Sequence, residues 1–189
     1  MIRVTSDKGY EPTTVADVIE AVGVSRTTFY KLFKDKGDCF LASYDAVVNV
    51  LVHHFQAAYS GPDRPWPQRV HAGLAALVEI LSREAPIARM AMVEVIAAGP
   101  LSRQRYRDAL SRFMPFLDEG RGWSEYGSML PVSTSRLAIG GAAALIFDEI
   151  RAGHGAGLEK LLPDLAFAVL MPFIGPEAAV EELRRDPSR

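Results

Sequence analysis

The chain has 189 residues, of which 49% are hydrophobic and 23% are charged. These fractions are ordinary for a folded domain and exclude extensive disorder. With 21 Lys and Arg against 23 Asp and Glu, the formal net charge is −2, which excludes a wholly basic surface. Any contact with nucleic acid must therefore use a local patch.

The single cysteine, Cys39, excludes an intramolecular disulfide framework and a cysteine-based zinc cluster, and it favours a reducing compartment. Residues 1–10 carry Arg3, Asp7 and Lys8 without an apolar stretch, so we expect no secretory signal. No segment is apolar enough for a membrane span. We expect a cytoplasmic protein without membrane contact.

Helical periodicity runs along nearly the whole chain, and no alternating strand pattern of useful length occurs, which predicts an all-α fold. Near the start, one apolar stripe at helical spacing predicts a short helix. Its members are Val15, Val18, Ile19 and Val22. Thr14 and Asp17 resemble a capping box at its start, and Gly23 is expected to end it.

Ser25 is placed to cap a second short helix, whose expected inward face is Phe29, Leu32 and Phe33. Further helices are predicted over about residues 36–59, 67–84, 86–98, 102–119, 133–152 and 158–174, with a short one from Pro176. Residues 60–67 read as a linker and 120–131 as a loop. Pro115 should kink its helix or end it early.

Two short helices joined by a tight glycine turn fit a helix-turn-helix, in which the second helix enters the major groove of DNA. Between Ser25 and Lys36 there are four basic residues and one acidic residue, a local charge of +3. Phosphate contacts supply affinity in such interfaces, so this concentration favours DNA binding. The alternative is an ordinary solvated helix pair, which is common in helical proteins.

A run of specific residues adds to this reading. It comprises Gly9-Tyr10-Glu11-Pro12-Thr13-Thr14-Val15, then Gly23-Val24-Ser25-Arg26-Thr27-Thr28-Phe29-Tyr30 and Phe33-Lys34-Asp35-Lys36. These residues resemble the DNA-binding domain of the TetR family of bacterial transcriptional regulators. The resemblance implies a homodimer with a small-molecule pocket in a larger helical domain, where ligand binding typically releases DNA.

By this resemblance, the expected DNA contacts lie on the second and third helices and at the start of the fourth. They are Thr14, Ser25, Arg26, Thr27, Thr28, Tyr30, Lys31 and Lys36. Arg26 suits guanine, and a threonine methyl suits thymine. Family members carry a fuller first helix and a basic arm before the Gly-Tyr pair, whereas eight residues precede Gly9 here. We therefore expect a shortened first helix, from a start assigned too late or a truncated chain.

The resemblance also implies that the last two long helices pair across a two-fold axis. Small residues from Gly140 to Ala144 would let backbones approach closely there. The expected interface residues are Leu137, Gly141, Leu145, Leu161 and Leu165. The alternative is that these residues form an intramolecular core.

For the effector pocket we expect aromatic and thioether lining with one carboxylate, Glu94, which sits inside an apolar run and needs a partner if it is buried. The candidates are Met90, Glu94, Phe113, Phe116, Trp123 and Phe147. Alternatively, the apolar residues are plain core and Glu94 lies on the wet side of its helix.

No catalytic set, metal-ligand spacing or cofactor motif emerges from the chain. We expect a DNA-binding domain over residues 1–42 and an effector-binding and dimerisation domain over 43–189. The predicted function is a repressor that a small molecule releases from a palindromic operator. The alternatives are an activator, or a helical small-molecule-binding protein or enzyme with a vestigial helix-turn-helix.

Overall fold

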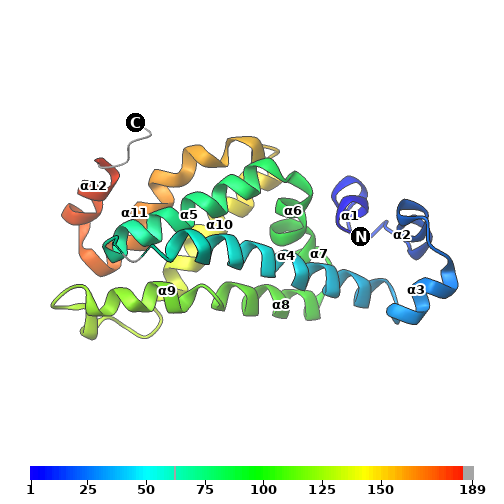
Figure 1. Cartoon of the computed structure of the whole chain (residues 1–189), viewed down its shortest axis with the longest axis horizontal. Helices are drawn as coiled ribbons and strands as arrows, with labels where there is room; N and C mark the ends of the chain where they lie inside the picture. Colours follow the sequence, from blue (N-terminus) through cyan, green and yellow to red (C-terminus); the bar gives the residue numbers. More distant parts are fainter. Residues whose placement is uncertain (62, 185–189) are drawn as a thin grey trace.

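The computed structural model describes residues 1–61 and 63–184, and within these ranges the regular elements are all helical. The predicted all-α fold is thus confirmed. Three short helices, α1 (Ile2–Lys8), α2 (Val15–Val22) and α3 (Arg26–Leu32), gather at one end of the long helix α4 (Lys36–Tyr59) (Figure 1).

The other helices form a larger domain together with the remaining length of α4 (Figure 1). In chain order they are α5 (Trp66–Arg83), α6 (Ala85–Arg89), the π-helical turn η1 (Met90–Glu94), α7 (Val95–Ala97), α8 (Pro100–Ser111), α9 (Met114–Asp118), the 3-10 turns η2 (Glu119–Gly122) and η3 (Gly127–Met129), α10 (Thr134–Arg151), the 3-10 segment η4 (Gly155–Leu161), α11 (Leu162–Ile174) and α12 (Pro176–Arg184).

The helix-turn-helix forms for the local reasons that its sequence indicates. The Thr14 hydroxyl accepts the Asp17 N–H, and the Asp17 carboxylate accepts the Thr14 N–H, which completes the predicted capping box. Gly23 ends α2 in the left-handed conformation at φ +67°, as expected of a glycine there. The Ser25 hydroxyl accepts the Thr28 N–H at 3.0 Å and caps α3.

Two residues of the expected inward faces are exposed instead. Val22 is 58% exposed and Leu32 is 69% exposed. Each is the last residue of its helix, beyond the turn that packs on the small core of Val18, Phe29 and Cys39. The inward stripes are therefore shorter than the periodicity predicts.

Three of the predicted longer helices are interrupted. The 86–98 segment contains the π turn η1, and the 102–119 segment breaks after Ser111, with Pro115 in the first turn of α9. The 158–174 segment starts as 3-10 helix and becomes α-helical only at Leu162, with Pro163 in the first turn. Proline is tolerated in a first turn because its missing N–H is not needed there.

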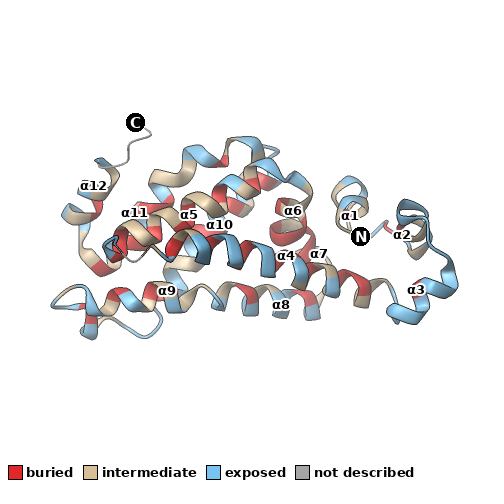
Figure 2. Cartoon of the chain, viewed as in Figure 1, coloured by how far each residue is buried: buried red, intermediate tan, exposed pale blue. Residues whose placement is uncertain are grey.

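The buried side chains form two separate cores. The smaller lies between α2, α3 and the start of α4, and the larger joins α4, α5, η1, α10 and α11. Figure 2 shows the buried positions along the inner helices, while α3 and its surroundings are mostly exposed. Helix α4 extends through both regions, and a domain boundary after residue 42 would fall inside it.

Across the described ranges, no helix combines the length and apolar character needed to cross a membrane.

Candidate DNA-binding helix and effector cavity

Helix α3 is held by one buried anchor and presents the rest of its surface to solvent. Phe29 is 3% exposed and packs in the small core. The other predicted contact residues of this helix and its cap are all exposed, namely Ser25, Arg26, Thr27, Thr28, Tyr30 and Lys31. The structure therefore brings these six residues together on one accessible helix.

Three hydroxyls among the predicted contacts already serve the helix caps. The Ser25 and Thr28 hydroxyl oxygens lie 2.9 Å apart at the start of α3, and the Thr14 hydroxyl donates to Asp17 at 2.8 Å. These side chains stabilise the caps of α2 and α3. Arg26 and Thr27 remain as exposed side chains in the first turn of α3 that the cap does not use.

Lys36, the predicted phosphate contact on α4, is half-buried and holds the small domain together. Its ammonium donates to the carbonyl oxygens of Tyr10 at 3.0 Å and Glu11 at 3.1 Å. It also lies 4.2 Å from the centroid of the Tyr10 ring, a cation–π contact. Because an ammonium has three donors, one remains for a phosphate.

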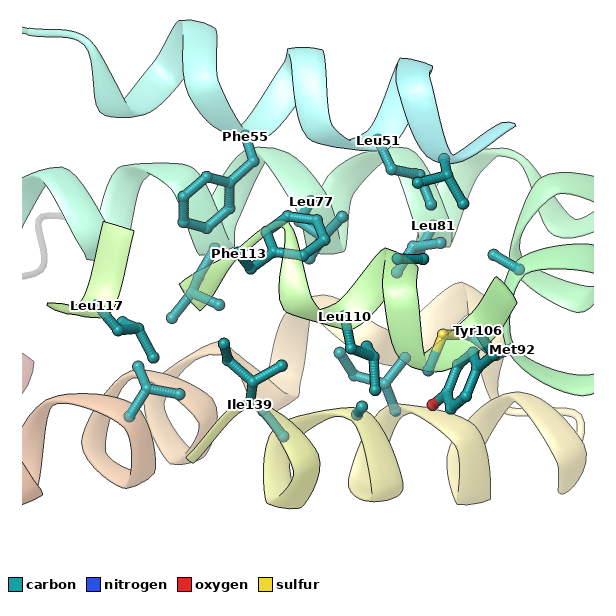
Figure 3. Close-up of a pocket in the computed structure, with 18 of the residues that line it drawn as sticks. Leu51, Phe55, Leu77, Leu81, Met92, Tyr106, Leu110, Phe113, Leu117 and Ile139 are labelled. Atoms are coloured by element: carbon teal, nitrogen blue, oxygen red, sulfur yellow. The ribbon is translucent and has the colours of Figure 1, made fainter. Parts of the chain in front are cut away.

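An apolar cavity of about 100 Å³ lies in the larger domain between α4, α5, η1, α8, α9, α10 and α11. Figure 3 shows side chains from these helices that line it. The wall consists of Tyr44, Val48, Leu51, Phe55, Val70, Leu74, Leu77, Leu81, Ala91, Met92, Tyr106, Ala109, Leu110, Phe113, Leu117, Ile139, Ala142, Ala143, Ile146 and Val169. Two tyrosines carry its only side-chain oxygen atoms, and burial raises the pKa of Tyr44 and of Tyr106.

Of the six predicted pocket residues, Phe113 lies on the wall of this cavity and the other five do not. Met90 is fully buried in the core, and Phe116 packs with a tilted ring against Phe55 and Tyr59. Trp123 is 50% exposed on the loop after η2. Phe147 lies under the Arg151 guanidinium on α10.

Glu94 is the most informative of these five, because it is buried and yet fully partnered. Its side chain is 5% exposed, and one carboxylate oxygen accepts from Arg89 at 2.8 Å. The other accepts the backbone N–H of Tyr10, also at 2.8 Å. Glu94 therefore links the larger domain to the loop before α2. Its burial is explained by this link, since Glu94 does not line the cavity.

The predicted dimer residues divide into two groups. Leu137 is 71% exposed, Leu145 is 36% exposed, and Gly141 is exposed on the same face of α10, while Leu161 is half-buried. Leu165 is 1% exposed and packs inside its own chain. For Leu165 the expected interface position is wrong, since residue 165 falls on the inner side of α11.

Comparison with known proteins supports the assignment of the N-terminal helices as a DNA-binding domain. Residues 2–43 match the family model described as bacterial regulatory proteins of the tetR family. Residues 2–43 therefore form a tetR-type DNA-binding domain. The match covers α1, α2, α3 and the first part of α4, which is the helix-turn-helix described above. No curated protein matches the chain.

Solved structures extend the likeness beyond this domain to the fold of most of the chain. The fatty acid degradation regulator FadR of Bacillus halodurans superposes with a TM-score of 0.75 at 16% identity, covering 89% of this chain and 90% of that one. FadR of Bacillus subtilis, in complex with stearoyl-CoA, gives 0.73 at 17% identity, covering 92% and 94%. A tetR-family regulatory protein from Rhodococcus RHA1 gives 0.68 at 18% identity, covering 91% and 92%.

Most of the cavity wall has no local sequence signal. Its residues are mostly ordinary apolar side chains from seven helical segments, so only the packing of those segments shows that they surround a space. The Tyr10–Glu94 bond spans 84 positions and is equally invisible in sequence. The sequence does indicate that Glu94 needs a partner, because it is a carboxylate within an apolar run and burial without a partner is costly.

Proposed function

We propose that this protein is a homodimeric cytoplasmic repressor that binds an operator through α3 and releases it when an elongated apolar molecule enters the cavity. The observation that carries the proposal is the position of η1. This turn supplies Ala91 and Met92 to the cavity wall and, two residues later, Glu94 to the contact with Tyr10. One element thus contacts both the ligand space and the DNA-binding domain.

For DNA recognition, the exposed surface of α3 supplies both kinds of contact. We assign base reading to Arg26 and Thr27 at its start, since a guanidinium can bridge two acceptors of guanine and a threonine methyl packs on thymine. Tyr30 and Lys31, further along the exposed helix, are assigned to phosphates. Four further residues would contact the DNA backbone with the hydrogen-bond donors that their present contacts do not use. They are Thr14, Ser25, Thr28 and Lys36.

The chemistry of the cavity wall selects the class of effector. Apolar side chains dominate it, so a buried ligand gains affinity chiefly from removing apolar surface from water. The polar part of a ligand would have only the Tyr44 and Tyr106 hydroxyls as side-chain partners. An acyl chain fits these conditions, and the Bacillus subtilis neighbour in complex with stearoyl-CoA supports this class.

The small size of the cavity means that the protein must change conformation when a ligand enters. At about 100 Å³ it is smaller than an engineered cavity of roughly 150 Å³ that admits benzene. An acyl chain therefore enters only if parts of the wall move outward. Wall and interior are close-packed, so such a displacement passes to neighbouring groups.

The path from the wall to the DNA-binding domain is short. Displacement of Met92 shifts η1, and with it the carboxylate of Glu94 that holds the Tyr10 N–H. Tyr10 in turn accepts from Lys36 at the start of α4. Helix α1 also packs directly on α6 and η1. A ligand would therefore reorient the two recognition helices of a dimer and change their fit to half-sites about one helical turn apart.

We place the dimer contact on the exposed face of α10. Leu137, Gly141 and Leu145 lie there, and no neighbouring atom would obstruct a side chain added at Gly141. Large apolar side chains on such a face are typical of an interface.

We propose binding and not catalysis at the cavity, because its wall offers no carboxylate, imidazole, amine or thiol that could act as acid, base or nucleophile. The decisive test is a fluorescence-anisotropy titration of the full chain against DNA from upstream of its own gene and against scrambled DNA, at two salt concentrations. A preference of roughly a thousandfold with a steep salt dependence supports a sequence-specific regulator. Weak and equal binding to both DNAs would contradict it and favour the ligand-binding protein with a vestigial helix-turn-helix.

The same titration separates a repressor from an activator. With hexadecanoyl-CoA present, a repressor of the proposed kind loses affinity for the operator DNA. A gain in affinity would instead identify a regulator that needs its ligand in order to bind DNA.

A further inference from the structure

A second hollow of about 340 Å³ adjoins the apolar cavity, between α8, the start of α9 and α10. Its wall consists of Gln104, Arg107, Asp108, Leu110, Ser111, Met114, Arg136, Ile139 and Gly140. Two of these residues, Leu110 and Ile139, also line the apolar cavity, where Figure 3 shows them. The boundary between the two spaces is thus formed by two apolar side chains.

The charges of the outer hollow contrast with the inner cavity. Two arginines and one aspartate line it, so its wall carries a net charge of +1. The Arg107 guanidinium donates to the amide oxygen of Gln104, and the Gln104 amide donates to Asp108 at 2.8 Å. Arg107 is therefore held by a neutral group, and the aspartate is bound by an amide.

Arg136, on the opposite wall, is exposed and makes no ion pair with any residue in the described ranges. By contrast, Arg105, also on α8, pairs with Asp45 at 3.5 Å. The hollow thus brings together two guanidinium groups from different helices, neither of them neutralised by a carboxylate in the described structure. Such groups form strong, charge-assisted bonds with carboxylates and phosphates.

We propose that this hollow is the anion-binding site for the polar end of the effector. The apolar chain occupies the inner cavity and passes between Leu110 and Ile139, and its carboxylate or phosphate lies against Arg107 and Arg136. This inference rests on the proposed function, because it assigns a polar end to the ligand of the same cavity. It makes the effector an anionic amphiphile and not a neutral hydrocarbon.

The test compares three probes with the same chain length, hexadecanoate, hexadecanoyl-CoA and the uncharged hexadecanol, by isothermal titration calorimetry on the full chain. The test variant is Arg107→Gln with Arg136→Gln. Its matched control is Arg105→Gln with Arg151→Gln, which removes the same charge from the same two helices outside the hollow. Thermal unfolding verifies that both variants remain folded, and Arg107→Lys with Arg136→Lys retains the charge without the planar fork.

The proposal predicts that the test variant binds at least one anionic probe about tenfold or more weakly and binds hexadecanol within about twofold of the wild type. The control variant should change neither affinity. A loss confined to hexadecanoyl-CoA identifies the phosphates as the bound group, and a loss for hexadecanoate identifies the carboxylate. Equal losses for charged and uncharged probes, or no loss at all, would overturn the anion site and leave the proposed function intact. If none of the probes binds wild-type protein, the assigned effector class and this site are both wrong.

Discussion

The Glu94 carboxylate accepts the backbone N–H of Tyr10 at 2.8 Å, although the two residues are 84 positions apart in the chain. One partner lies in the π turn that lines the apolar cavity, and the other opens the loop before α2. π-Helical turns are rare and are found frequently at functional sites. In this protein the turn contacts both the apolar cavity and, through Tyr10 and α1, the DNA-binding domain.

The first prediction concerns this bond. Glu94→Ala removes the acceptor of the Tyr10 N–H and the partner of Arg89, and we expect a loss of about 1–3 kcal/mol of stability. Hexadecanoyl-CoA should still bind, since Glu94 is not on the cavity wall. The ligand should, however, change operator affinity far less than in the wild type, when both are measured by anisotropy at a temperature where both are folded.

Glu79→Ala is the matched control for this variant, because its carboxylate pairs with Arg83 on the exposed side of α5. It should preserve the full effect of the ligand on DNA binding. If Glu94→Ala retained that effect as well, the coupling would not run through the Tyr10 contact.

The second prediction separates base reading from general support in the small domain. Arg26→Ala should lose discrimination between operator and scrambled DNA, by about 1–3 kcal/mol, with little change in melting temperature. Lys36→Ala should weaken both DNAs about equally and also lower the melting temperature, because Lys36 holds the Tyr10 and Glu11 carbonyls. Equal effects of the two substitutions on both DNAs would refute this division.

The third prediction fills the cavity. Ala143→Leu adds three carbon atoms on the α10 side of the wall, where about 100 Å³ is open, so the side chain competes with the ligand for the same space. We expect weaker binding of hexadecanoyl-CoA by at least tenfold, roughly, with DNA affinity retained and insensitive to the ligand. Ala46→Leu, at an exposed position of α4, is the control and should leave both measurements unchanged.

The fourth prediction concerns the exposed face of α10. Leu137→Asp places a charge where the dimer contact is proposed and should give a monomer by sedimentation velocity, with operator affinity greatly reduced. Leu101→Asp makes the same change at a 62% exposed leucine of α8 and should remain dimeric. A dimer that survives Leu137→Asp would place the interface elsewhere.

The fifth prediction is a pH dependence in the small domain. Lys8 lies 2.5 Å from the Asp17 carboxylate, and this bond, with the capping contacts to Thr14, lowers the pKa of Asp17 to about 2. A depressed folded-state pKa stabilises the fold above the unfolded-state pKa of about 3.9, and the contribution disappears as the pH falls toward 2. Lys8→Met should raise the pKa of Asp17 in a carbon-13 NMR titration, and its stability deficit relative to wild type should shrink over the same pH range. An Asp17 pKa that is unchanged by the substitution would contradict the assignment.

The sequence predicts a feature well when the interactions that form it join residues close together in the chain. The capping box of Thr14 and Asp17, the left-handed Gly23 and the Ser25 cap depend on contacts within three or four residues, and all are present as predicted. The ends of α2 and α3 deviate, since Val22 and Leu32 match the helical period but lie beyond the small core.

Longer-range features could not be predicted in this way. Phe113 and Phe116 are three positions apart on neighbouring turns, and only the fold shows that the first lines the cavity while the second stacks on Tyr59. The same holds for Leu165, because helical spacing alone does not show whether this face of α11 packs against its own chain or against a partner subunit. The burial of Glu94 could be anticipated as a choice between pairing and exposure, but its partner Tyr10 could not.

The most direct test of the account is the affinity of the full chain for its upstream DNA, measured by anisotropy with and without saturating hexadecanoyl-CoA. The account predicts sequence-specific binding that the ligand weakens roughly 5–150-fold, the usual range for allosteric coupling. Ligand binding that leaves the affinity for this DNA unchanged would contradict it, because the cavity and α3 would then be independent.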